Sequence, residues 1–88
     1  MRIDFGNTTT STLTITIEPW AEEHRLESGD RVSISFQGER IAVPLIEVST
    51  TGLIVYGSPG STVSVLRNGT ECSGAGHIKA PDVPPASR

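Results

Sequence analysis

The chain has 88 residues, a hydrophobic fraction of 35% and a formal net charge of −3. A chain of this length forms at most one domain, and it buries a modest share of its surface when it folds alone. It has no cluster of Lys and Arg that could displace counterions from a nucleic acid or bind an anionic membrane surface, so we expect no nucleic-acid and no membrane partner.

The compartment is indicated by the cysteine count and by hydropathy. Cys72 is the one cysteine, so an internal disulfide is excluded, and small secreted domains usually carry several disulfides. The first residues contain no apolar signal segment, and no run of about 18 apolar residues occurs. The sequence therefore predicts a soluble cytoplasmic protein.

The two ends differ in composition from the middle of the chain. Residues 1–11 finish in a run of Thr and Ser, and residues 73–88 are rich in Gly and Pro with few large apolar side chains. Such segments bury too little apolar surface to offset the entropy of ordering them. We predict a flexible N-terminus over 1–11, a single β domain over 12–72 and a disordered tail over 73–88.

The first predicted strand covers residues 12–17, which read Thr-Leu-Thr-Ile-Thr-Ile and alternate polar with apolar side chains. Pro19 ends it, since proline removes a ladder donor. Residues 20–28 fit either a short helix after the proline or an extended segment, and we favour the extended form because eight residues make a weak isolated helix. In that form, Trp20, Glu22 and His24 share one face.

Further strands follow at short intervals. Residues 31–37 alternate, residues 41–48 are apolar on both faces, and Pro44 places that second strand at an edge or a bulge. Residues 53–56 and 62–67 are also strands, and Asn68-Gly69 predicts a type I′ hairpin turn that pairs residues 70–72 with 63–66. The fold class is therefore all-β, a small antiparallel β-barrel or sandwich of five to six short strands.

Five acidic residues against one basic residue give residues 18–30 a local excess of negative charge. A solvated strand face explains such a run better than a cation site does. His24 lies among these acids, but two neighbouring groups are only a fragment of a metal site, which needs three or four converging ligands. We predict no metal site and no cofactor.

The sequence lacks the full set of residues that nucleophilic catalysis requires. The chain contains no Gly-x-Ser-x-Gly turn, and His24 is the one histidine inside the predicted domain. Cys72 and His77 fall at its mobile end, where preorganisation is poor. The expectation is a protein without enzymatic activity; an enzyme would need at least one further polar group converging on His24.

Four residues are candidates for ligand binding, namely Trp20, Glu22, His24 and Tyr56. Trp and Tyr side chains anchor many interfaces and stack on ligands, although a small core with few aromatics also needs them for packing. A small-ligand or cation site would require these four side chains to line one cavity.

Several segments together resemble a group of small bacterial β proteins, and the resemblance covers about residues 12–70. The segments are residues 17–20 (Ile-Glu-Pro-Trp), 26–32 (Leu-Glu-Ser-Gly-Asp-Arg-Val), 57–61 (Gly-Ser-Pro-Gly-Ser), 65–66 (Val-Leu) and 68–69 (Asn-Gly). The spacing of Gly52, Pro59 and Ser61 is similar to part of the second cupin motif, which implies a shortened, cupin-like half-barrel. The His-x-His pair and the later histidine of cupins have no counterpart here, so the resemblance implies no activity.

Two functions remain as hypotheses. The first is a non-enzymatic interaction and oligomerisation module, a homodimer that joins through the apolar edge strand at residues 41–48, because a core this small gains from partner burial. The alternative is a cupin-like small-ligand or metal-binding barrel that uses the face of Trp20, Glu22 and His24.

Overall fold

The computed structural model describes residues 1–38, 44–72 and 80. Within them the chain forms eight strands and no helix, which confirms the predicted all-β class. The strands are β1 (Arg2–Gly6), β2 (Leu13–Glu18), β3 (Glu22–Leu26), β4 (Arg31–Gln37), β5 (Leu45–Val48), β6 (Gly52–Tyr56), β7 (Thr62–Arg67) and β8 (Thr70–Glu71).

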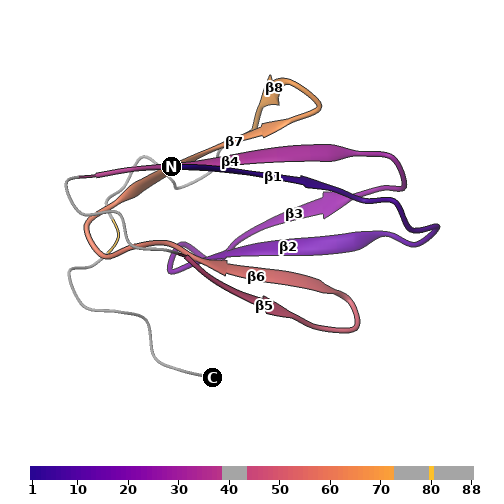
Figure 1. Cartoon of the computed structure of the whole chain (residues 1–88), viewed down its shortest axis with the longest axis horizontal. Helices are drawn as coiled ribbons and strands as arrows, with labels where there is room; N and C mark the ends of the chain where they lie inside the picture. The colour runs from indigo at the N-terminus through magenta and orange to yellow at the C-terminus, as the bar shows by residue number, and fades with distance from the viewer. Residues whose placement is uncertain (39–43, 73–79, 81–88) are drawn as a thin grey trace.

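The strands form two four-stranded sheets that lie face to face (Figure 1). One sheet has the order β1-β4-β7-β8, and the other has the order β3-β2-β6-β5. Neighbouring strands run antiparallel except β2 and β6, which are parallel. The expected purely antiparallel pairing is corrected at this point, because the chain crosses through the other sheet between β2 and β6, and a long crossover permits parallel pairing.

The core lies between the sheets and follows from the alternation of apolar residues. Ile15 and Ile17 of β2 and Ile34 and Phe36 of β4 are almost fully buried, whereas the residues between them are more exposed. Successive side chains of a strand point to opposite faces, so each strand contributes every second residue to the core. The core cluster consists of Ile15, Ile17, Leu26, Val32, Ile34, Phe36, Val55, Val63 and Val65.

The N-terminal segment was expected to be flexible over residues 1–11, and this is wrong for residues 2–6. Strand β1 pairs with β4 over its whole length, and Ile3 and Phe5 pack against the core. The residue after it, Asn7, is buried, and its side-chain amide donates to the carbonyls of Ser11 and Leu26. The alternation of Arg2, Ile3, Asp4 and Phe5 was therefore a strand pattern, and the domain begins before residue 12.

The C-terminal tail was expected to be disordered over 73–88, and residue 80 departs from that expectation. Ala80 is buried; its N–H donates to the carbonyl of Ser61, and its carbonyl accepts from the N–H of Gly60. The remainder of the expected tail, 73–79 and 81–88, lies outside the described residues.

Two local predictions are confirmed. The extended form is correct for residues 20–28, where β3 pairs with β2 along its length. Asn68 and Gly69 both have positive φ, 50° and 84°, and they join β7 to β8 as the type I′ turn requires. The described residues form eight strands against the five to six expected, and β1 is the strand without a predicted counterpart.

Candidate functional site

The core-facing side of β3 carries a histidine and a glutamate in contact. His24 lies opposite Ile15 and Glu22 opposite Ile17 in the register with β2, so both side chains point toward the core. Nε2 of His24 lies 2.5 Å from Oε2 of Glu22, and each side chain is only 9% exposed. Residues two apart on a strand share a face, which explains why the sequence predicted this pair.

A third group reaches His24 from the opposite sheet. Sγ of Cys72, the residue that follows β8, lies 3.8 Å from Nδ1 of His24. The N–H of Cys72 donates to the carbonyl of Val65 at 2.9 Å, which fixes the cysteine backbone against β7. We call Glu22, His24 and Cys72 the thiol cluster. The Asn68-Gly69 turn indicates from the sequence that the chain returns beside β7, but no local pattern links Cys72 to β3.

The thiol of Cys72 is held in its neutral form. Partial burial raises the pKa of the Cys72 thiol, although the residue is exposed, and the nearby negative charge of Glu22 acts in the same direction. Both effects disfavour the thiolate, the charged form. A proton acceptor is therefore needed before this sulfur becomes a strong nucleophile, and Nδ1 of His24 is the group facing it.

Trp20 packs against an aromatic ring of the other sheet. Its ring stacks on Phe36 of the other sheet with centroids 6.2 Å apart and an interplanar angle of 23°. A side chain at Gly57 would meet the Trp20 ring at 2.6 Å, so the indole lies directly over that glycine. Trp20 therefore has the packing role that was weighed against ligand stacking.

Tyr56 binds a different partner. Its hydroxyl donates to Oε1 of Glu47 at 2.6 Å. Strand alternation places Tyr56 on the face of β6 opposite to that of Val55, which belongs to the core cluster. The four candidate ligand residues are thus divided: Glu22 and His24 lie together on the core side, while the Tyr56 hydroxyl lies with Glu47.

The acidic stretch is largely engaged by its neighbours. Asp30 accepts from Arg67 at 2.6 Å and from the side-chain amide of Asn68 at 3.1 Å, and Glu27 accepts from the hydroxyl of Thr12. The hydrogen bond from Asn68, followed by that from Arg67, lowers the pKa of Asp30 from 3.8 to about 2. This carboxylate ties the β3–β4 turn to the β7–β8 turn.

The part of the chain that the structure describes contains neither a cluster of metal ligands nor a membrane-spanning helix. Over residues 1–38, 44–72 and 80, no three His, Cys, Asp or Glu side chains are placed to hold a metal ion. Over the same residues, no helix has the length and hydropathy to cross a bilayer. His77 lies outside the described residues.

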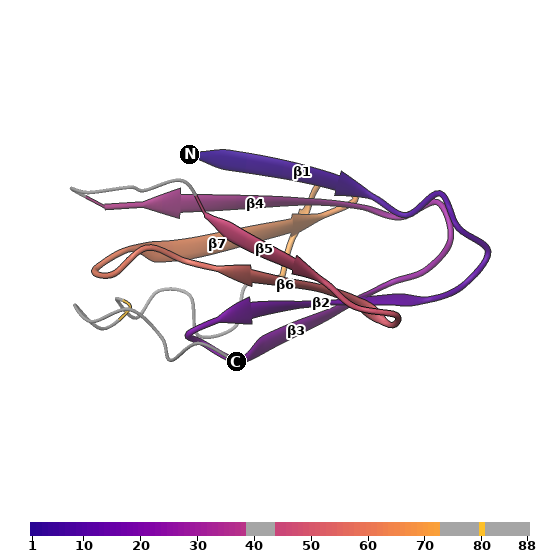
Figure 2. The ribbon, with the colours of Figure 1, turned by 60° about the horizontal axis from the view of Figure 1, so that its bottom comes forward.

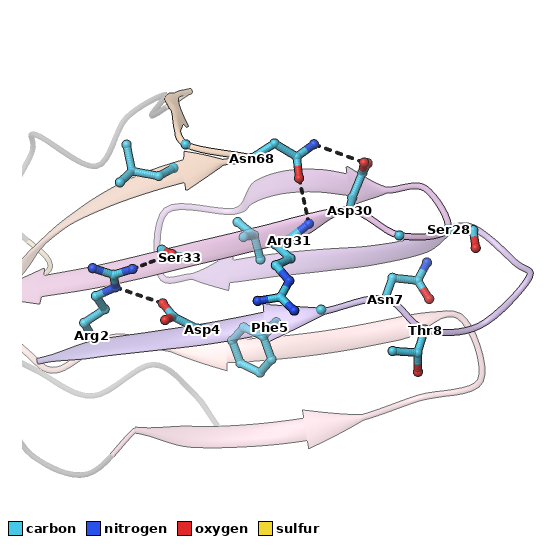
Figure 3. Close-up of a pocket in the computed structure, with 15 residues that line it drawn as sticks. Arg2, Asp4, Phe5, Asn7, Thr8, Ser28, Asp30, Arg31, Ser33 and Asn68 are labelled. Carbon is cyan, nitrogen blue, oxygen red and sulfur yellow. Dashed lines mark hydrogen bonds and ion pairs between the residues drawn. The ribbon is translucent and has the colours of Figure 1, made fainter.

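A surface hollow lies over β1 and β4, beside the β7–β8 turn (Figure 3). Both of its carboxylates are already bonded: Arg2 donates to Asp4 at 2.9 Å and to the hydroxyl of Ser33, and Asp30 accepts from Arg67 and from Asn68. Oppositely charged side chains that already pair with each other offer a charged ligand little net attraction. The hollow therefore does not indicate a class of ligand.

The outer edge of the second sheet is apolar. Strand β5 pairs with β6 alone among the described strands, as Figure 2 shows, which confirms the expected edge position. Leu45 and Val48 are 60% and 79% exposed, and Ile46 is exposed as well. Residues 41–43 of the predicted strand lie outside the described residues. Edge strands usually carry charges or other features that prevent pairing, and this one carries only Glu47, which is bonded to Tyr56.

No family model matches the chain, and neither a curated protein nor a solved structure matches it. The resemblance to small bacterial β proteins and to cupins stays a prediction. The function is therefore argued from the geometry of the β5 edge and of the thiol cluster.

Proposed function

We propose that this protein is a self-associating β module in which the β5 edges of two copies pair and join their sheets. The observation that carries the proposal is the exposure of Leu45 and Val48 on a strand whose outer edge has no neighbour among the described strands. An exposed edge presents N–H and C=O groups that a second strand can bind. A second copy is the chosen partner because antiparallel pairing of one strand with itself is self-complementary and closes with two-fold symmetry.

The alternation of backbone hydrogen-bonding groups along β5 identifies those that face the free edge. The N–H of Ser49 donates to the carbonyl of Gly52 in β6. Backbone groups of a strand alternate between its two sides, so Glu47 and Leu45 also bond toward β6. The N–H and C=O groups of Ile46 and Val48 consequently point to the free edge, where a second copy can bind them.

Charge selects the register of the pair. In a continuous antiparallel sheet, directly opposite residues lie on the same face, so the two-fold axis sets one residue opposite the same residue of the partner. The two central residues of β5, Ile46 and Glu47, are the candidates for that position. An axis at Glu47 places two like charges directly opposite each other, which is destabilising. An axis at Ile46 instead pairs Ile46 with the partner's Ile46 and sets Leu45 opposite the partner's Glu47, so this register is favoured.

The test is the mass in solution, measured by size-exclusion chromatography with light scattering over a range of concentrations. We expect a dimer for the native chain and a monomer for Ile46→Lys, because the favoured register sets Ile46 opposite the partner's Ile46 and the substitution places two like charges directly across from each other. Leu66→Lys is the matched control, since Leu66 is also an exposed large apolar residue but lies on β7 in the other sheet.

Two results of this measurement would contradict the proposed dimer. A native chain that remains monomeric at high micromolar concentration contradicts the proposal. A dimer that survives in Ile46→Lys but is lost in Leu66→Lys would place the interface on the other sheet and would also overturn it.

A further inference from the structure

The thiol cluster carries a second inference that goes beyond self-association. Its three groups come from separate places in the chain: Glu22 and His24 from β3, and Cys72 from the end of the β7–β8 hairpin in the opposite sheet. They form a line in which the imidazole lies between a carboxylate at 2.5 Å and a thiol at 3.8 Å. A nucleophile, a base and a group that orients the base form the arrangement used for covalent catalysis.

The carboxylate determines which ring nitrogen is free to accept a proton. An ionised carboxylate only accepts hydrogen bonds, so Nε2 of His24 carries the proton that it donates to Glu22. In the neutral ring, Nδ1 then holds the lone pair, and this is the nitrogen that faces Sγ of Cys72. Because the imidazole and the carboxylate are both nine-tenths buried, their orientation is fixed by the surrounding packing.

The three groups differ in solvent exposure, and covalent catalysis needs the nucleophile to be the accessible one. Cys72 is exposed, so a reagent can reach its sulfur, whereas the base and its orienting partner face the core. Burying a polar pair on the apolar side of a sheet is unfavourable unless the groups bond each other. A purely structural Glu–His pair would satisfy that requirement without the cysteine, so the experiment has to separate the two roles.

We propose that Cys72 is an acyl-accepting thiol that His24 activates as general base and Glu22 positions. The substrate class is an activated acyl compound, a thioester or an aryl ester. As Sγ attacks the carbonyl carbon, its proton moves to Nδ1 of His24 and a C–S bond forms. The bond from that carbon to the leaving group then breaks; the leaving group keeps the electron pair and takes the proton from His24. The products are a Cys72 thioester and a free thiol or phenol, and no oxidant or reductant is required.

The role of Glu22 is positional. Its carboxylate holds the imidazole in the tautomer that accepts at Nδ1, and it stabilises the imidazolium formed during the transfer. The neutral resting state of the thiol agrees with this scheme, since the proton leaves Sγ only as the new bond forms. Because the chain has one cysteine, one acyl group is expected per chain.

The experiment uses p-nitrophenyl acetate and the full chain. Release of p-nitrophenolate gives the acetylation rate, and mass spectrometry locates the acetyl group. The variants are Cys72→Ser, His24→Gln and Glu22→Gln, with Arg25→Gln and Glu23→Gln as matched controls on the exposed face of the same strand.

We expect one acetyl group on Cys72 in the native chain and none on that position in Cys72→Ser. His24→Gln should lower the rate by about a hundredfold, within the range for general-base catalysis, and Glu22→Gln by about tenfold. The two control variants should react at the native rate. Circular dichroism checks that each variant is folded, and if His24→Gln does not fold, the comparison of Glu22→Gln with Glu23→Gln decides.

The pH dependence of the acetylation rate shows whether His24 activates the thiol or has a structural role alone. With His24 as base, the native rate levels off while the thiol is still protonated, whereas the rate of His24→Gln continues to rise with the fraction of thiolate. Equal rates and equal pH profiles for the native chain and folded His24→Gln would overturn the proposal. So would a native rate no higher than that of the chain unfolded in urea at the same pH.

Discussion

Nε2 of His24 lies 2.5 Å from Oε2 of Glu22 on the side of β3 that faces the core. Both side chains are mostly buried, so removal of Glu22 leaves the Nε2–H of His24 buried without this acceptor. The exposed residues of the same strand, Glu23 and Arg25, are also an acid and a base two residues apart, but they face the other way. This difference in facing gives the first stability prediction its control.

Glu22→Ala is expected to lower the free energy of unfolding by about 1–3 kcal/mol, because the Nε2–H of His24 loses its acceptor while it stays buried. Glu23→Ala, one residue away on the exposed face, should change it by less than about 0.5 kcal/mol. Urea denaturation of both variants measures the difference. Equal losses in the two variants would show that the His24–Glu22 contact does not stabilise the fold.

Tyr56→Phe removes the hydroxyl that donates to Glu47 at 2.6 Å, and with it the side-chain link between β6 and the edge strand β5. We expect a loss of about 1.5–3 kcal/mol, typical of a hydrogen bond to a charged group. Amide hydrogen exchange should become faster at Leu45 and Glu47, whose N–H groups face β6. Unchanged exchange in β5 would mean that this contact does not hold the edge strand in place.

Gly52→Ala is expected to destabilise the fold by about 3 kcal/mol or more, because overpacking against backbone cannot be relieved by a rotamer change. A Cβ at position 52 would lie 1.8 Å from the carbonyl oxygen of Thr14, at the start of the parallel β2–β6 pairing. Gly6→Ala is the control, since its Cβ would meet only the Arg31 side chain at 3.9 Å. Thermal unfolding of the two variants side by side tests the contrast, and similar midpoints would contradict it.

Asp30→Asn tests the pH dependence of stability. The pKa of Asp30 is lowered from 3.8 to about 2 by Asn68 and Arg67, so folding favours the ionised carboxylate. The unfolded chain binds more protons between these two values, and the stabilisation is therefore complete above pH 3.8 and lost as the pH falls toward 2. We expect the native chain to be more stable than Asp30→Asn at about pH 6, with the gap narrowing steadily below about pH 4. A gap that stays constant across this range would show that Asp30 stabilises the turns through contacts that do not depend on its charge.

Local sequence patterns determined most of the strands and the β7–β8 turn. The alternation in residues 12–17 and 31–37 placed Ile15, Ile17, Ile34 and Phe36 in the core, and Asn68-Gly69 specified the hairpin that closes β7 on β8. The same pattern in Arg2–Phe5 was overlooked because Thr8–Ser11 after it reads as a loop. These features depend on residues close together in the chain, because the period of two determines which side chains of a strand share a face and the φ preferences of a residue determine the turn type.

Only the tertiary structure decided which strands became neighbours. The parallel pairing of β2 with β6, the outer position of β5 and the approach of Cys72 to His24, 48 residues apart, depend on how the two sheets pack. The period of two assigns each side chain to a face of its own strand, but it carries no information on which strand lies across from that face. His24 and Glu22 could therefore be predicted as a pair from the sequence alone, whereas the thiol that completes the cluster became visible only when the second sheet was in place.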